Sequence, residues 1–234
     1  MINGRDFNLA NRHIARTALI VHHKALRYTI GLKIMREFAG ICLVTFCLFI
    51  AKTANASEPL ESENLFTKGH YEAALTSGVL FSPFIADGGR PTINYTISEA
   101  QLGYMLGDTK GGGWLRGNFE LLGEAFGGAI FQGPGDYIAG MTIWTRYNFV
   151  QPNWRFIPYV QAGAGLTATD IDQHIVGQTF NFNLDLGIGA RYLINQRWAL
   201  MLEYRYQHIS NANSAEHNLG INANGPILGV AYLF

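Results

Sequence analysis

The sequence predicts an all-β protein, an eight-stranded antiparallel up-and-down transmembrane β-barrel of the outer membrane. From residue 57 onward, apolar and polar side chains alternate with a period of two, which is typical of strands with two different faces. Only 15% of the residues are charged, whereas 27 of the 234 are glycine and 13% are aromatic. No run of about 18 apolar residues is present, so we expect no membrane-spanning helix.

Residues 1–56 are predicted to be a signal region that takes no part in the fold. A short apolar segment, 38–51, follows a basic stretch and is followed by an Ala-Asn-Ala motif that ends at Ala56. These are the parts of a secretory signal peptide, with cleavage expected after Ala56. Translation is expected to begin at Met35, which would place residues 1–34 upstream of the true start; a long basic leader is the alternative.

The remaining residues, 57–234, carry 9 basic and 15 acidic side chains, a net charge of −6. A negatively charged chain suits an exported protein and argues against binding to nucleic acid, whose phosphates would repel it. Both cysteines lie in the apolar leader segment, so disulfide and thiolate chemistry are excluded from this part of the chain.

The clearest strand is 180–192, with Phe, Leu, Ile, Ala and Tyr at even positions and Asn, Asp, Gly and Arg at odd positions. Its length suits a tilted strand that crosses a membrane, which needs about 9–11 residues in the apolar zone. The same alternation predicts strands at 115–125, 137–149 and 199–209. Less regular alternation predicts four more, at 69–81, 92–105, 156–167 and 218–234.

The connections between these segments differ in length. Residues 151–153 and 195–197 are predicted to be short turns, whereas 106–113 and 170–178 are predicted to be longer polar loops. Antiparallel strands joined alternately by short turns and long loops are typical of an up-and-down barrel.

The apolar face is predicted to lie outside, against lipid. The opposite positions combine charged side chains with many glycines, as expected for the crowded interior of a narrow eight-stranded barrel. The last segment alternates down to Phe234, which resembles the final-strand signal recognised by the outer-membrane barrel assembly machinery. A soluble lipocalin-like barrel is the alternative. Aromatic residues gather near strand ends, like an interfacial girdle, at Tyr147, Phe149, Trp154, Phe156, Tyr192 and Trp198.

Two polar motifs are assigned no chemistry. Gly111–Gly113 follows Lys110, but it lacks the residue order and the strand-to-helix setting of a phosphate-binding loop. Asp170, Asp172 and His174 alternate in a polar loop and have the side chains of a metal site, yet such a group on a surface loop is more often simply solvated. We therefore predict no metal and no cofactor.

His208 and Ser210 form the candidate catalytic pair. They are two positions apart on one predicted strand and share a face, the lipid-facing one that also carries Leu202, Tyr204 and Tyr206. A histidine within reach of a serine is the arrangement in which a base activates a hydroxyl nucleophile. The alternative is an interfacial pair at the membrane rim, where polar groups cost little.

The segment 208–212, His-Ile-Ser-Asn-Ala in the penultimate strand, and Asn218 beyond it resemble the PagL-type lipid A 3-O-deacylases, which are eight-stranded outer-membrane ester hydrolases. The resemblance implies that His208 is the base, that Ser210 is the nucleophile, and that Asn211 supports the site. It implies that Asn218 helps to form the oxyanion hole. The implied reaction removes the ester-linked 3-hydroxyacyl chain from position 3 of lipid A.

The chain departs from the family pattern at two positions. Asn213 replaces a glycine whose N–H assists the oxyanion; because asparagine tolerates a left-handed backbone, we expect the amide still to be presented. Asn222 stands where well-studied members have a glutamate. Its carbonyl can orient the imidazole but carries no full charge, so we predict a slower enzyme by about 1–3 kcal/mol of barrier. Glu216 is an alternative acid.

The sequence therefore predicts a serine esterase of the Gram-negative outer membrane, with His208, Ser210 and Asn222 catalytic and Asn218 and Asn213 at the oxyanion. A non-catalytic barrel, an adhesin or a structural protein, is the alternative, and the missing glutamate supports it. The sequence leaves a homodimer open. A narrow pore is disfavoured because the inward charged residues are expected to pair and fill the lumen; these are Glu120, Glu124, Asp185, Arg191, Glu203 and Arg205.

Overall fold

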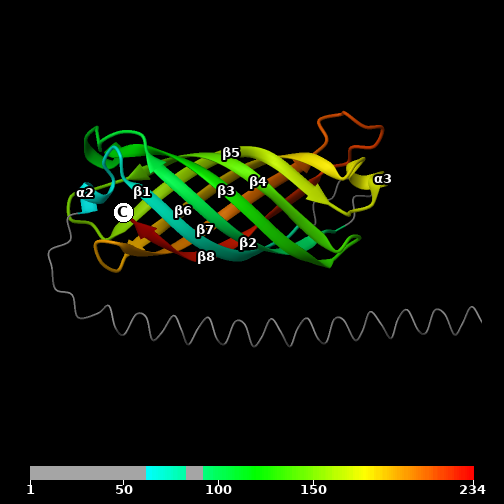
Figure 1. The fold of residues 1–234 in the computed structure, drawn as a ribbon, viewed down its shortest axis with the longest axis horizontal. Helices are drawn as coiled ribbons and strands as arrows, with labels where there is room; N and C mark the ends of the chain where they lie inside the picture. The colour runs from blue at the N-terminus through cyan, green and yellow to red at the C-terminus, as the bar shows by residue number, and fades with distance from the viewer. Residues whose placement is uncertain (1–61, 83–91) are drawn as a thin grey trace, which may run out of the picture. The chain divides into compact units, whose positions relative to one another are not determined.

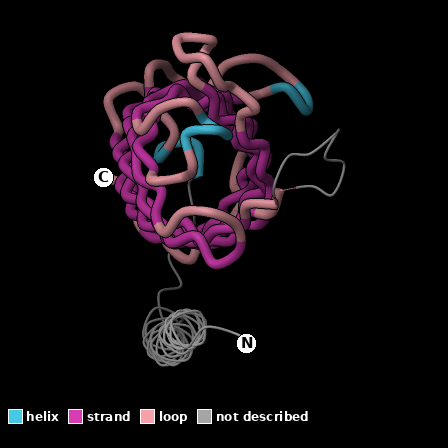
Figure 2. The backbone as a smooth tube through the Cα atoms, turned by 90° about the vertical axis from the view of Figure 1, so that its right-hand side faces the viewer, coloured by secondary structure: helices cyan, strands magenta, loops and turns pink. Residues whose placement is uncertain are grey.

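The computed structural model describes residues 62–82 and 92–234. The predicted signal region, 1–56, lies outside these residues, and its cleavage stays a prediction. Eight antiparallel strands form a closed barrel in chain order, and β8 completes it by pairing with β1 (Figures 1 and 2). The strands are β1 (Tyr71–Leu80), β2 (Asn94–Met105), β3 (Gly117–Gln132), β4 (Tyr137–Phe149), β5 (Phe156–Thr169), β6 (Phe180–Leu193), β7 (Trp198–Ser210) and β8 (Ile221–Leu233).

The described residues also form three short helices, α2 (Ser62–Leu65), η1 (Gly113–Leu115) and α3 (Gln173–Val176). Within the two described ranges, no helix is long and apolar enough to span a membrane. α2 and the C-terminus lie at one end of the barrel, called here the terminal end, and α3 lies at the opposite end, called the loop end (Figure 1).

The predicted regular alternation of short and long connections is wrong. The long 106–116 connection lies at the terminal end with the short turns, where Lys110 and Gly117 exchange backbone hydrogen bonds of 2.8 and 2.9 Å. The short 133–136 connection lies at the loop end. It is short because β3 extends to Gln132, past the predicted end at 125. Gly127 and Gly128 interrupt the alternation of side chains there, but both still pair with β4.

The apolar row of each strand faces outward and the polar row faces inward. Leu75, Met141 and Ile188 are 65%, 66% and 63% exposed, whereas Arg146 and Arg205 are fully buried. A continuous belt of exposed apolar side chains around a polar interior is stable against lipid and not in water. The soluble lipocalin-like alternative, which would bury the apolar face, is therefore wrong.

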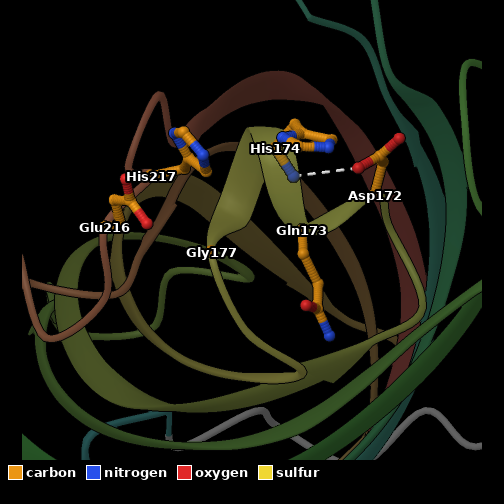
Figure 3. A pocket seen from close by; sticks show the side chains of 6 residues that line it. All are labelled: Asp172, Gln173, His174, Gly177, Glu216 and His217. Atoms are coloured by element: carbon orange, nitrogen blue, oxygen red, sulfur yellow. Dashed lines mark hydrogen bonds between the residues drawn. The ribbon is translucent and has the colours of Figure 1, made fainter.

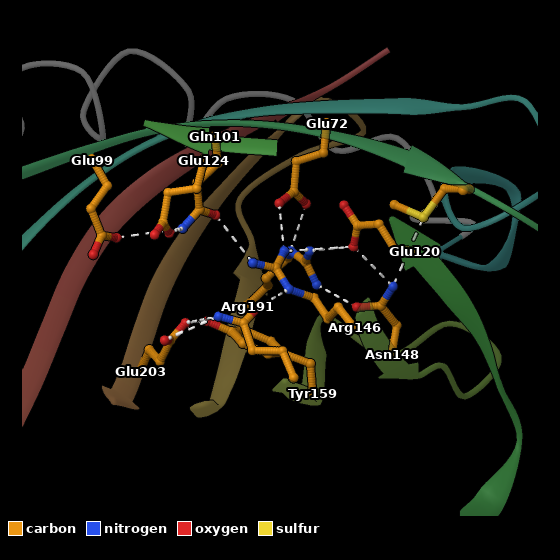
Figure 4. Close-up of polar contacts among 12 residues, drawn as sticks. Glu72, Glu99, Gln101, Glu120, Glu124, Arg146, Asn148, Tyr159, Arg191 and Glu203 are labelled. Atoms are coloured by element: carbon orange, nitrogen blue, oxygen red, sulfur yellow. Dashed lines mark hydrogen bonds and ion pairs between the residues drawn. The ribbon is translucent and has the colours of Figure 1, made fainter. Parts of the chain in front are cut away.

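Ion pairs fill the middle of the lumen (Figure 4). Arg146 and Arg191 lie between Glu72 and Glu120, with an Arg146 Nη1 to Glu72 Oε1 distance of 2.9 Å and an Arg191 Nη2 to Glu120 Oε2 distance of 2.9 Å. Arg205 forms a second cluster with three carboxylates, those of Glu99, Glu124 and Glu203.

The prediction that inward charges pair is confirmed for five of its six residues. The sixth, Asp185, instead accepts hydrogen bonds from Asn183 and Thr142. At the terminal end, the buried Phe66, just after α2, packs over the lumen with its ring centroid 5.6 Å from the Arg191 guanidinium. Paired charges below a covered mouth argue against an open pore.

Candidate functional site

The predicted site residues lie at the loop end of β7 and β8. Ile209 and Ile221 are directly paired in the strand register, and both are buried in an apolar cluster at that end of the lumen. Because successive side chains of a strand alternate between faces, this anchoring turns His208, Ser210 and Asn222 outward, as predicted. All three are half-buried.

His208 and Asn222 are cross-strand partners. His208 Nδ1 lies 2.6 Å from Asn222 Oδ1, and the hydroxyl of Tyr206 donates to the same oxygen over 2.8 Å. Because an amide oxygen only accepts, Nδ1 is the donor in this contact, and in the neutral ring Nε2 is then the accepting nitrogen. The alternative acid, Glu216, is exposed in the 211–220 connection, and His208 takes Asn222 as its hydrogen-bond partner.

Ser210 is opposite Phe182 of β6, so an aromatic side chain flanks it on the barrel wall. Among the described residues, no hydrogen bond joins Ser210 to His208; in ligand-free enzymes such bonds are often long and tighten only with substrate. Gly220 passes beside the pair with a left-handed backbone of φ +67°, and an added Cβ there would lie 3.1 Å from Ile209 O, 3.4 Å from His208 Cε1 and 3.7 Å from Ser210 Cβ.

The connection after Ser210 has a left-handed backbone at Ala212 and Asn213, with φ of 51° and 62°. This backbone at Asn213 is compatible with the expected presentation of its amide, which stays a prediction. Asn218 Nδ2 donates to Asn213 Oδ1 over 2.9 Å, and Asn218 Oδ1 accepts from the Asn211 backbone N–H over 3.2 Å. The structure therefore places the two residues predicted at the oxyanion in direct contact.

Asn211 joins the two connections at the loop end. Its side chain is fully buried, and its Nδ2 donates to the carbonyl oxygens of Val176 (3.0 Å) and His217 (2.7 Å). Gly177 allows this approach, because a Cβ there would lie 2.1 Å from His217 O and 2.3 Å from Asn211 Nδ2. Asn211 thus fixes the 211–220 connection against α3, and its support of catalysis stays a prediction.

A polar cavity of about 440 Å³ lies between these connections (Figure 3). Residues of the α3 segment line one side, and Glu216 and His217 line the other. The rings of His174 and His217 are 5.2 Å apart between centroids. Within the described ranges, no three His, Cys, Asp or Glu side chains gather as a metal site.

Asp170 and Asp172 have local structural partners. Asp170 Oδ1 accepts from the N–H groups of Asp136 and Tyr137 over 2.9 and 3.0 Å, and Asp172 Oδ1 accepts from the N–H of His174 over 2.8 Å. Slight burial raises the pKa of Asp170, but the N–H groups of Tyr137 and Asp136 outweigh it and hold the pKa below its usual range.

Two contributors to the site were not predicted from the sequence. The alternation places Tyr206 on the apolar wall. It predicts which face of the strand a side chain occupies, but not which hydrogen-bond partner its hydroxyl finds. No sequence pattern indicates Gly220, since its position beside His208 depends on how the 211–220 connection folds.

Comparison with known proteins places this geometry in context. The crystal structure of the outer membrane enzyme PagL matches with 16% identity and a TM-score of 0.49, over 68% of this chain and 97% of that chain. Neisserial surface protein A matches with 17% identity and a TM-score of 0.53, over 71% of this chain and 98% of that chain. At 17% identity, the likeness to Neisserial surface protein A establishes the fold alone. No curated protein matches the sequence.

A family match is more specific. The family described as Lipid A 3-O-deacylase (PagL) matches residues 92–231, more than half of the chain. That range contains the outward-facing His208, Ser210 and Asn222 together with Asn218. The chain belongs to the lipid A 3-O-deacylase (PagL) family.

Proposed function

We propose that this protein is a serine esterase of the outer membrane that removes the 3-hydroxyacyl chain from position 3 of lipid A. The family match supports the reaction class and the substrate. The observation that carries the assignment of residues is the hydrogen bond between His208 Nδ1 and Asn222 Oδ1, on the same outward face as Ser210. It leaves Nε2 of His208 available as a base at the edge of the apolar wall.

In the proposed mechanism, Ser210 Oγ attacks the ester carbonyl while His208 Nε2 accepts the hydroxyl proton. The same proton passes to the departing sugar oxygen, which leaves an acyl-enzyme. Water, activated by His208, then releases the 3-hydroxy fatty acid and regenerates Ser210. Asn222 holds the imidazole in the tautomer that both steps need.

The oxyanion is assigned to Asn218 and to the backbone N–H of Asn213. Asn218 Nδ2 has two hydrogens and gives one to Asn213 Oδ1, which leaves one for the developing negative charge. The left-handed backbone at Asn213 is the conformation in which a glycine would present its amide.

The barrel wall accommodates the acyl chains. Leu202, Tyr204 and Tyr206 face outward on β7, and Phe182 and Leu184 flank Ser210 and His208 on β6. A substrate already embedded in the outer leaflet can reach Ser210 without leaving the membrane. The sugar bonded to the ester oxygen would then lie toward the polar cavity of the loop end.

Outer-membrane location is supported by the family and by the outward apolar belt. Delivery through the signal region and recognition of Phe234 by the barrel assembly machinery remain part of the proposal, as does a homodimer. A non-catalytic barrel is the second candidate, favoured by Asn222 in place of a glutamate and by the absence of a hydrogen bond between His208 and Ser210.

The two candidates are separated by assaying the purified protein in detergent with lipid A and measuring release of 3-hydroxy fatty acid. We expect wild type and Ser77→Ala to release it and Ser210→Ala to release none. Ser77 is a matched control because it also faces outward, on β1, and its hydroxyl bonds to Ile97 O and Ser98 Oγ, away from His208. Equal release by wild type and Ser210→Ala would exclude Ser210 as the nucleophile.

A further inference from the structure

Two tyrosine–asparagine hydrogen bonds run in parallel along the outer wall. Tyr206 donates to Asn222 Oδ1 over 2.8 Å, and Tyr204 donates to Asn224 Oδ1 over 2.5 Å. Tyr206 is directly opposite Asn224, and its hydroxyl reaches diagonally to the next outward residue of β8. Both bonds run from a tyrosine hydroxyl of β7 to an asparagine oxygen of β8. Of the two asparagines, only Asn222 also contacts His208.

An asparagine beside a catalytic histidine has a difficulty that a glutamate does not. Both oxygens of a carboxylate accept hydrogen bonds, so either one selects the tautomer with a proton on Nδ1. An amide has one accepting end and one donating end. If Asn222 turned its NH2 toward His208, Nδ1 would have to accept, the proton would move to Nε2, and His208 could not act as the base.

We propose that Tyr206 is a positioning residue that locks the amide of Asn222 with its oxygen toward His208. This inference rests on the proposed function. A phenol needs an acceptor for its proton, and Asn222 Oδ1 is the acceptor that the structure gives Tyr206. Turning the amide would leave that O–H unpaired on an apolar wall, which is unfavourable.

The lock makes a specific prediction about kinetics. Tyr206→Phe removes the hydroxyl and keeps the ring, so the wall and its packing are preserved. We expect kcat to fall about fivefold with KM unchanged, the factor that one ordinary hydrogen bond supplies. Tyr147→Phe is the kinetic control, because it removes a tyrosine hydroxyl that donates to the Leu115 carbonyl at the terminal end, away from His208, and its kcat should equal that of wild type. Tyr204→Phe, which removes the equivalent bond to Asn224 without touching His208, is the control for the ring tautomer.

An Asn222→Asp background distinguishes a lock from a structural role. Aspartate has nearly the shape of asparagine but two accepting oxygens, so it needs no orientation. Tyr206→Phe should therefore leave kcat unchanged when Asp occupies position 222. An equal fall in both backgrounds would show that the Tyr206 hydroxyl acts in some way other than by orienting the amide of residue 222, and would overturn the inference.

A second measurement does not depend on turnover. The ¹⁵N resonances of the His208 ring distinguish Nδ1–H from Nε2–H, and we expect Nδ1–H in wild type and in Tyr204→Phe but a mixture in Tyr206→Phe. An unchanged tautomer in Tyr206→Phe would overturn the lock. If the wild type released no fatty acid from lipid A while the tautomer still shifted, the lock would stand and the proposed function would fail.

Discussion

His208 of β7 and Asn222 of β8 face each other across the strand register and are joined by a 2.6 Å hydrogen bond from Nδ1 to Oδ1. The bond lies on the outer surface of the barrel, whereas the salt bridges of Arg146, Arg191 and Arg205 lie inside the lumen. A polar contact placed on the lipid-facing wall contributes nothing to filling the lumen. Its position beside Ser210 is what gives it a catalytic interpretation.

Asn222→Glu is expected to raise activity. A carboxylate would orient the imidazole equally well and would also stabilise the imidazolium that forms when His208 takes the proton, worth about 1–3 kcal/mol, or about 5- to 150-fold in kcat. The measurement is fatty-acid release from lipid A at saturating substrate. Asn224→Glu is the control, since it places the same charge on the same face away from His208. An unchanged kcat for Asn222→Glu would contradict the role of residue 222.

Asn218→Ala is expected to lower kcat about 10²- to 10³-fold, as loss of one oxyanion donor does in other acyl-transfer enzymes. Because Asn218 also bonds to the Asn211 N–H and to Asn213 Oδ1, folding must be checked separately, by the heat-dependent shift of the barrel on gels. A well-folded Asn218→Ala with wild-type kcat would remove Asn218 from the oxyanion hole.

Asn213 is expected to tolerate glycine and to reject valine. Glycine adopts a φ of 62° without strain and keeps the N–H, whereas a β-branched residue is strongly disfavoured there. Asn213→Gly should therefore retain at least wild-type kcat, and Asn213→Val should lose activity while the barrel stays folded. Similar kinetics for the two variants would mean that the backbone amide at 213 does not contact the oxyanion.

Arg205→Ala is expected to destabilise the barrel by about 3–5 kcal/mol, because it leaves buried carboxylates without their cation. Urea unfolding in detergent measures the change. The control is Arg197→Ala, since Arg197 is exposed at a turn and its guanidinium donates to the Tyr232 hydroxyl; its loss should cost less than about 1 kcal/mol. Equal midpoints for the two variants would contradict the ion-pair account of the lumen.

Asp170 is expected to stabilise the loop end in a pH-dependent way. Its pKa in the folded protein is held below the unfolded value of about 3.9, so its contribution is complete above that value and is lost as the pH falls through the folded pKa. Asp170→Asn keeps an accepting oxygen but removes the charge. It should lower the urea midpoint slightly near pH 7, and this difference should shrink as the pH falls through the folded pKa; a difference that grew on acidification would have the wrong sign.

Most of the fold could be predicted because every strand of a membrane barrel alternates between apolar and polar side chains. Each strand must present one row to lipid and one to a narrow lumen, and 180–192 shows both rows without interruption. The prediction failed where the alternation lapses. The glycines of β3 interrupt its alternation, so the continuation to Gln132 was not predicted. The pairing of Lys110 with Gly117 depends on backbone hydrogen bonds, which the pattern of polar and apolar side chains does not predict.

The candidate site could be predicted in part. The alternation along β7 and β8 predicts that His208, Ser210 and Asn222 share the outward face. The strand register of the structure then pairs His208 with Asn222. The family resemblance supplied Asn218 and Asn213, which no periodicity indicates. The Tyr206 contact and the clamp formed by Asn211 depend on side-chain direction and on the fold of two connections, and these follow from packing rather than from spacing.

The central claim is tested most directly by mass spectrometry of lipid A from a deacylase-free Gram-negative host that expresses either the wild-type chain or Ser210→Ala. Both proteins should appear as folded barrels in the outer membrane. We predict that lipid A loses one 3-hydroxyacyl chain with the wild type and stays intact with Ser210→Ala. Intact lipid A in both strains, or the same loss in both, would contradict the account.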